Sequence, residues 1–248
     1  MTSRVVAAEV LDHLEPDDPA ARRSRRDLVR LHRVMGSRAI VRRGWRLLVS
    51  PQRAQAPLRI LELGAGDGRF LLAVARSLAV AWPHVQLSLL DRQNIVAPAT
   101  LAGFAALGWQ TDVQVADVLA WAADRPADAA TGQPAPRWDL ITSTLFLHHF
   151  DGAELDLLLA AIASRCDRFF ACEPSRSRLA LAGSHLVGAI GANAVTREDA
   201  VTSVQAGFRH DEISAHWPRQ AGGAWQTREV AAGLFSHCFS ARRCGAVG

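Results

Sequence analysis

An α/β fold with a seven-stranded, mostly parallel sheet is the architecture that this sequence predicts. From residue 58 to residue 174, short apolar strand-like runs alternate with helical segments, and this alternation is typical of a parallel sheet. A glycine-rich turn joins the first strand to the first helix. Two further strand-like segments, joined by a tight turn at Gly233, come last and add a hairpin.

The chain begins with helical segments rather than with the sheet. An acidic turn around Pro16 and Pro19 is followed by an arginine-rich stretch, in which Leu28, Leu31 and Met35 recur at helical spacing. This pattern predicts one or two amphipathic helices with a basic face. That face is either a solvated surface of helices that cover the sheet or a surface that attracts an anionic substrate, partner or membrane.

The remaining elements are expected in the following order. The parallel strands are predicted at residues 58–63, 85–90, 113–116, 139–143 and 168–172. The helices between them are predicted at residues 70–82, 97–107 and 152–164, and residues 124–137 are expected to form an exposed loop. Beyond the fifth strand, one helix is expected over 176–191, another from a capping box at Thr196 to about residue 207, a short helix over 211–217, and strands over 225–231 and 234–242.

The turn after the first strand carries the strongest functional signal. Its glycines are Gly64, Gly66 and Gly68, preceded by the carboxylate of Glu62. A dinucleotide fingerprint would need glycine at position 69, which is Arg69. Glycines allow positive φ and close approach of a ligand, and the following helix start favours anionic groups.

This E-x-G-x-G-x-G pattern resembles the first motif of the class I S-adenosylmethionine (SAM)-dependent methyltransferases. The resemblance implies a Rossmann-like methyltransferase fold with an antiparallel last strand, extra N-terminal helices and SAM as the cofactor. Backbone N–H groups of the turn, which includes Ala65, suit the carboxylate of SAM, and Glu62 suits its ammonium group directly or through water.

Further cofactor contacts are expected where the next strands end, because ligands of open α/β sheets bind beyond the carboxyl ends of the strands. Asp91 can accept both ribose hydroxyls, with Arg92 beside it. Asp117 resembles the family residue that accepts from the adenine amino group, and Val118 offers a neighbouring backbone contact. An acid after a strand can also be a simple surface residue.

The segment after the fourth strand resembles the fourth motif of small-molecule methyltransferases. It runs from Ser143 to Phe150, and backbone in this motif commonly lines the sulfonium and methyl region. It includes His148 and His149, either of which could hold the loop or face the substrate as a general base. His149 is the first candidate for the base.

The amino-acid composition limits the classes of protein to which this chain can belong. The chain has a net charge of +4 and no lysine or tyrosine, and this modest charge does not by itself indicate nucleic-acid binding. No secretory signal or membrane-spanning run is visible, and the four cysteines show no metal-binding or C-x-x-C spacing. We therefore expect a cytoplasmic protein with reduced cysteines and no metal site.

The domain prediction has two parts. Residues 1–55 are expected to form an N-terminal helical cap, and residues 56–248 a SAM-binding methyltransferase domain, in which residues 175–218 form a helical insertion that covers the substrate. Short stretches at residues 171–174, 195–200 and 233–237 also resemble a bacterial subgroup associated with type III polyketide synthases.

The predicted function is methyl transfer from SAM to a small molecule, at a phenolic or polyketide-type hydroxyl. The alternatives are a quinone-type C-methyltransferase, a SAM-binding protein without catalysis, a nicotinamide-dependent oxidoreductase and a nucleic-acid methyltransferase. Methyl transfer needs positioning and desolvation, and it needs a base only if the nucleophile is protonated.

Overall fold

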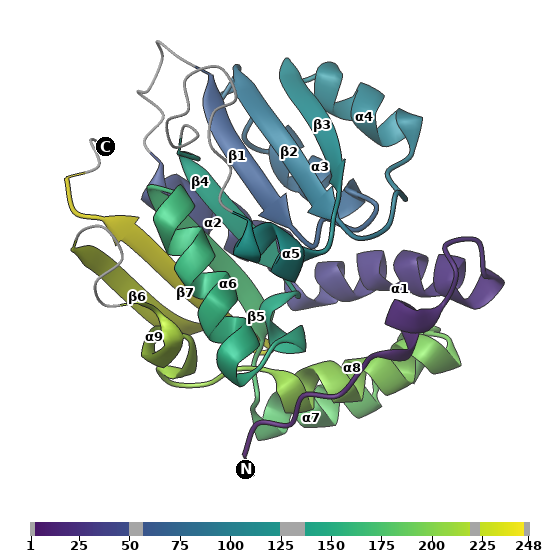
Figure 1. Ribbon diagram of the computed structural model, residues 1–248. Helices are drawn as coiled ribbons and strands as arrows, with labels where there is room; N and C mark the ends of the chain where they lie inside the picture. The colour runs from purple at the N-terminus through teal and green to yellow at the C-terminus, as the bar shows by residue number, and fades with distance from the viewer. Residues whose placement is uncertain (1–2, 50–56, 125–136, 219–223, 246–248) are drawn as a thin grey trace.

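The computed structural model describes residues 3–49, 57–124, 137–218 and 224–245 of the chain. It contains one seven-stranded sheet in the order β3-β2-β1-β4-β5-β7-β6 (Figure 1). The strands are β1 (Leu58–Leu63), β2 (Val85–Asp91), β3 (Trp109–Val115), β4 (Leu140–Thr144), β5 (Arg168–Pro174), β6 (Trp225–Ala232) and β7 (Ser236–Arg243). Strands β1 to β5 pair in parallel, whereas β7 is antiparallel to both β5 and β6. The predicted Rossmann-like fold is therefore confirmed, with its last strand antiparallel.

Helices cover both faces of this sheet. They are α1 (Pro19–Met35), α2 (Ser37–Leu48), α3 (Arg69–Arg76), α4 (Pro98–Ala105), α5 (Val118–Ala123), α6 (Gly152–Arg165), α7 (Arg178–His185), α8 (Ala194–Ala206) and α9 (Glu212–His216), with 3₁₀ turns η1 (Val10–His13), η2 (Leu147–His149) and η3 (Val187–Ile190). Helices α5, α6 and α9 pack on one face, and α2, α3 and α4 pack on the other. Among the described residues, no helix combines the length and the apolar character needed to span a bilayer.

The two cores follow from strand alternation. Phe169 and Phe170 are neighbours in β5, yet they belong to opposite cores because successive side chains of a strand point to opposite faces. Trp45 of α2 is fully buried on the second face, where its indole N–H donates to the Thr142 hydroxyl at 3.1 Å. Helix α2 is thus fixed to the sheet itself.

Helix α1 lies instead at the edge of the sheet where the parallel strands end. Asp18 caps its start by accepting from the N–H groups of Ala20 and Ala21, and Gly36, with φ of 68°, ends it. In Figure 1 the arrowheads of β1 and β2 point towards α1, and α7 and α8 lie on its other side. The carboxyl edge of the sheet, at which open α/β sheets bind their ligands, therefore faces a helical layer.

A segment near the N-terminus runs along this helical layer. We call residues 3–13 the N-terminal arm. Its Val5 N–H donates to the Gln205 carbonyl at 3.2 Å, and the Asp199 carboxylate of α8 accepts from the N–H groups of Val10 and Leu11 at 2.7 and 3.0 Å. The arm is consequently tied to α8, although nearly the whole chain separates them in sequence.

Some element boundaries differ from the sequence prediction. Strand β3 begins at Trp109, four residues before the predicted start at 113, because Trp109 is itself buried and its indole N–H donates to the Trp82 carbonyl at 3.0 Å. Helix α5 was not predicted. The segment expected as one helix over 176–191 forms α7 and the separate turn η3. Most of the predicted loop at 124–137 lies outside the described residues.

The start of α8 is a further correction. The predicted capping box placed its first residue at Thr196, but the helix begins at Ala194. Asn193 is the actual N-cap, since its side-chain oxygen accepts from the Thr196 N–H at 2.8 Å. The expected acid at the third helical position instead has another role, because Asp199 binds the N-terminal arm.

Candidate active site

A cleft of about 530 Å³ opens between the carboxyl ends of the strands and the helical layer. Its walls come from the glycine turn, the ends of β2, β3 and β4, helix α1 and the N-terminal arm. All the site residues predicted from the sequence line it except Gly68 and Ser143, and Thr144 lines it in place of Ser143. The structure thus brings the separate motifs of the sequence into one space.

The glycines of the turn are needed for three different reasons. Gly64, Gly66 and Gly68 all have positive φ, at 68°, 55° and 71°. A Cβ on Gly64 would lie 2.2 Å from the ring of Phe146, whereas a Cβ on Gly66 would meet nothing within 4 Å. Gly66 therefore leaves open space in the cleft, and Gly68 ends the turn as the N-cap of α3.

Asp91 is held in place by the backbone around it. One carboxylate oxygen accepts from the Gly66 N–H at 2.8 Å, and the other accepts from the Gln93 N–H at 2.9 Å. Each oxygen retains acceptor capacity, so the oriented carboxylate can receive two hydroxyl groups from a ligand. Arg92 also lines the cleft, where it forms an ion pair with Asp12 at 3.2 Å.

Glu62 lines the cleft, and its carboxyl group is both buried and raised in pKa. It is 3% exposed, and its Oε2 has no hydrogen-bond partner among the described residues. Burial, together with the nearby Glu173 carboxylate, raises the pKa of Glu62 to about 8. The group is mostly protonated at neutral pH and would gain strongly from a cationic ligand.

Asp117 serves as the N-cap of α5. Its Oδ1 accepts from the N–H groups of Leu119 and Ala120 at 2.8 and 3.0 Å, which fixes the carboxylate at the rim of the cleft. Val118 begins the helix and also lines the cleft. The cap explains why a helix starts here, and because both capping bonds go to Oδ1, Oδ2 retains acceptor capacity.

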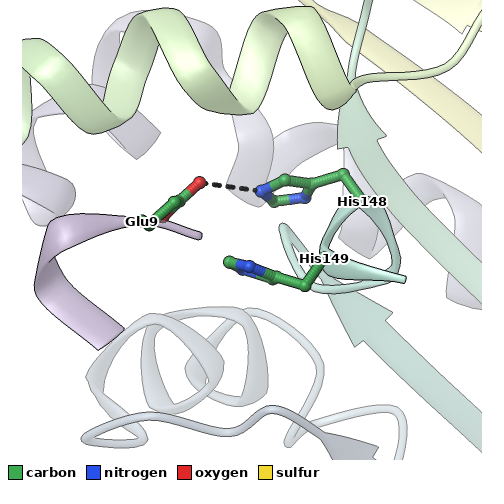
Figure 2. A group of neighbouring side chains, drawn as sticks. All are labelled: Glu9, His148 and His149. Atoms are coloured by element: carbon green, nitrogen blue, oxygen red, sulfur yellow. Dashed lines mark hydrogen bonds and ion pairs between the residues drawn. The ribbon is translucent and has the colours of Figure 1, made fainter. Parts of the chain in front are cut away.

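The loop after β4 is built around a buried carboxylate. Glu173 is fully buried and accepts from the backbone N–H groups of Phe146 and Leu147, at about 3 Å each. It also pairs with His148 Nδ1 at 2.9 Å, while His148 Nε2 lies 3.2 Å from Oε1 of Glu9 (Figure 2). Burial alone would lower the pKa of His148, but its hydrogen bonds to Glu173 and Glu9 raise it to about 9. His148 is therefore a cation that joins the loop to the N-terminal arm.

His149 differs from its neighbour in charge. Its ring centroid lies 4.3 Å from that of His148, and its Nδ1 lies 3.4 Å from an Asp12 oxygen. Burial and the positive charge of His148 lower the pKa of His149 below its ordinary value. The imidazole is thus neutral at pH 7, and its ring lines the cleft, as a general base requires.

Comparison with solved structures identifies the architecture, whereas no protein-family model and no curated protein sequence matches the chain. The plantazolicin methyltransferase BpumL, in complex with a triazolic desmethylPZN analog and SAH, has a TM-score of 0.62 at 11% identity, over 91% of this chain and 92% of that chain. An O-methyltransferase family protein from Burkholderia thailandensis has a TM-score of 0.56 at 18% identity, over 93% of this chain. This chain has the class I methyltransferase fold. It spans 62% of the length of the Burkholderia protein.

Several residues of this methyltransferase fold line the cleft but were not predicted. Two come from the N-terminal arm, Glu9 and Asp12, and two from α1, Arg25 and His32. His32 stacks on Phe70 with ring centroids 4.0 Å apart, burial lowers its pKa to about 4, and its Nδ1 has no partner within the part of the chain that the structure describes. No motif surrounds these residues, so only their spatial proximity reveals them.

One group in the cleft could also hold a metal ion. Glu9, His148 and His149 each offer a ligand atom, and these atoms lie within 4.8 Å of one another. Nitrogen and oxygen ligands of this kind suit Zn²⁺ or another divalent transition metal. No metal site was expected from the sequence because the cysteines show no metal-binding spacing, and Glu9 is far from the histidines in the chain. A metal would have to displace the proton that His148 shares with Glu9.

Proposed function

We propose that this chain is a SAM-dependent methyltransferase that acts on a small molecule, at a phenolic or polyketide-type hydroxyl. The observation that carries this proposal is the buried Oε2 of Glu62, which has no partner among the described residues and belongs to a residue that lines the same cleft as Gly66. An ammonium group of a ligand seated on the glycine turn would satisfy that oxygen. The SAH in the BpumL complex supports the same cofactor here.

The other cleft residues fit the remaining parts of SAM. Asp91 would accept the ribose hydroxyls, and Asp117 and Val118 would contact the adenine. When bound, SAM supplies a methyl group on a positively charged sulfur. The backbone at Thr144 and Leu145, which lines the cleft where β4 ends, would border that methyl group.

His149 is proposed as the general base. Its Nδ1 lies 3.4 Å from an Asp12 oxygen, which favours a proton on Nδ1, and Nε2 would then accept the proton of a hydroxyl. A phenol has a pKa of about 10, so it is protonated at neutral pH and gains from such a base. His148 is excluded from this role by its own proton and instead holds the loop.

Binding and transfer experiments test this proposal. We expect calorimetry to detect SAM and SAH binding but not NAD binding, and labelled SAM to transfer its methyl group to phenols. Asp91→Ala should weaken SAM binding by about 1.5–3 kcal/mol, the value of hydrogen bonds to a charged group, and Asp91→Asn by less. If the protein binds NAD but not SAM, the proposal is refuted. If the methyl group is transferred to carbon, the acceptor is of the quinone type and not a phenolic hydroxyl.

A glycine pair gives a matched control. Gly66→Val should abolish cofactor binding in a folded protein, because the branched side chain fills the open space above the turn. Gly36→Val places the same side chain at a glycine of similar φ, 68°, with open space around it but outside the cleft. It should show comparable backbone strain and retain SAM affinity. Normal affinity in the Gly66 variant would mean that the turn is only structural.

A further inference from the structure

A second cavity, of about 140 Å³, lies within the helical layer beside the cleft. Apolar side chains from α1, α7, η3 and α8 dominate its wall, among them Leu31, Ala180, Val187 and Val204. We propose that this cavity, called the tail pocket, binds an uncharged apolar tail of the methyl acceptor, either an alkyl chain or a second ring. The proposal rests on the proposed function for the reacting end of that molecule.

The tail pocket and the cofactor cleft share a wall. Glu9, Leu11, Leu28, Leu145 and Ser203 line both spaces. The two spaces are therefore adjacent, and Leu145, directly after β4, lies in the wall of both. An acceptor whose tail occupies the pocket would enter the cleft at this point. This is where the backbone would border the methyl group.

The backbone at this junction is strained, which supports a functional role. Leu145 has φ of 54°, in the left-handed region that a leucine rarely adopts. Its N–H donates to the Cys172 carbonyl at 2.9 Å, so the neighbouring strand holds the conformation. Strain of this kind persists mainly at functional sites. Here it places one residue in the walls of both spaces.

The polar groups in the wall have partners within the protein. The Ser24 hydroxyl donates to Asn193 at 3.1 Å, and the Ser184 hydroxyl donates to a carbonyl of its own helix at 2.8 Å. The Asp199 carboxylate accepts from the N-terminal arm. A ligand would find few free polar groups here, so the pocket favours an apolar occupant.

The charged residues in the wall of the tail pocket also favour an uncharged ligand. Every basic side chain of the sequence other than histidine is an arginine, 28 in all, yet none lies in the wall of the tail pocket as far as the chain is described. Glu9 and Asp199 are the charged residues there, and both are acidic. A tail that ends in a carboxylate, phosphate or sulfate would be repelled and left without a partner.

The volume of the tail pocket limits the length of the tail. One water needs about 10–15 Å³, so the pocket has room for on the order of ten groups of that size.

A series of 4-n-alkylphenols, from methyl to octyl, tests the pocket by calorimetry in the presence of saturating SAH. The dissociation constant should fall about fourfold for each added methylene, the value of burying one CH₂, until the pocket is full. A phenol with a terminal carboxylate on a chain of equal length should bind at least about tenfold more weakly. Equal affinity along the series, no binding of any member, or tighter binding of the carboxylate would overturn the proposal.

Matched substitutions locate the binding. Ala200→Phe on α8 fills the pocket and should remove the dependence on chain length, while Ala194→Phe on the exposed side of the same helix should preserve it. Val187→Ala enlarges the pocket and should move the optimum to longer chains, which keeps the test decisive if the phenylalanine variant unfolds. If both Ala200→Phe and Val187→Ala left the chain-length profile unchanged, the tail would bind elsewhere. SAM binding and methyl transfer are measured separately and test the proposed function. If binding depends on chain length but no methyl group is transferred, the tail pocket is supported and catalysis on phenols is refuted.

Discussion

His148 and His149 are adjacent in sequence, yet their surroundings give them opposite protonation states. The two carboxylates that face His148, Glu173 and Glu9, stabilise its imidazolium. That imidazolium and burial then keep His149 neutral. A paired motif in the sequence thus divides into one residue that holds the loop and one that can accept a proton.

His149→Ala should lower turnover with a phenolic acceptor about 10²–10⁴-fold, the usual value of a general base, without changing SAM affinity. The deficit should shrink at high pH, where the phenol ionises unaided. The pH–rate profile of both proteins checks this. His148→Ala is the comparison, and it should reduce thermal stability because Glu173 and Glu9 lose the cation between them. Loss of SAM binding in the His149 variant would indicate a structural role instead.

Glu62 should release a proton when the cofactor binds. Its pKa of about 8 means that it is roughly nine-tenths protonated at pH 7, and a ligand ammonium group beside it would lower that pKa. Affinity for SAH should therefore rise with pH up to about 8. Calorimetry in two buffers of different ionisation enthalpy measures the release, which should approach one proton.

Substitutions at Glu62 and Asp91 test whether Glu62 is the source of the released proton. Glu62→Gln should abolish the proton release and weaken binding. Asp91→Asn should weaken binding but keep the release, because Glu62 is still present. A release that is unchanged in Glu62→Gln would assign the proton to another group.

At the scale of elements, the N-terminal arm connects α8 to the loop after β4. The Arg4 guanidinium donates to the carbonyls of Ala206 and His148, at 2.7 and 3.1 Å, and lies 4.2 Å from the centroid of the Phe208 ring. Glu9 adds its contacts with His148 and Ser203. The arm thereby forms part of the wall of both the cleft and the tail pocket.

Asp199→Ala should loosen the arm. The substitution removes two hydrogen bonds to a buried carboxylate, about 1.5–3 kcal/mol of local stability, so amide exchange in residues 5–13 should accelerate roughly 10- to 100-fold. The Michaelis constant for the acceptor should rise with it. Asp199→Asn retains one acceptor oxygen and should show a smaller effect. Exchange rates equal to those of the wild type would show that the other contacts suffice to hold the arm.

The sequence predicted the elements with local signals and missed those that depend on distant contacts. The strands around the glycine turn were located because apolar runs and turn residues occur together. The early start of β3 depends on a hydrogen bond between Trp109 and Trp82, and the role of Glu9 depends on a residue 139 positions away. Neither contact leaves a periodic pattern. The sequence therefore predicted residues at the strand ends that line the cleft and a helical segment over them, but not the individual residues of the arm and α1 that line it.

At the scale of the whole molecule, the sheet and the helical layer contribute different halves of the site. The sheet supplies the residues proposed for the cofactor, at the ends of β1, β2 and β3. The helical layer and the arm supply most of the tail pocket. Methyl transfer needs the acceptor and the methyl group to be aligned and shielded from water. A site between two layers achieves both when the layers pack together around the ligands.

Cofactor binding should therefore stabilise more than the glycine turn. At a concentration of SAH about 100-fold above its dissociation constant, mass action adds about 2.7 kcal/mol, which corresponds to a rise in Tm of about 5–10 °C for a chain of this size. Asp12 and His13 of the arm line the same cleft as Gly66 and Asp91. Amide exchange should consequently slow in residues 5–13 as well as in the turn. NAD at the same concentration should do neither, and Gly66→Val should abolish both effects while Gly36→Val retains them. A rise in Tm with protection of the turn alone would mean that the arm does not contact the cofactor, and the helical layer would then act on the acceptor only.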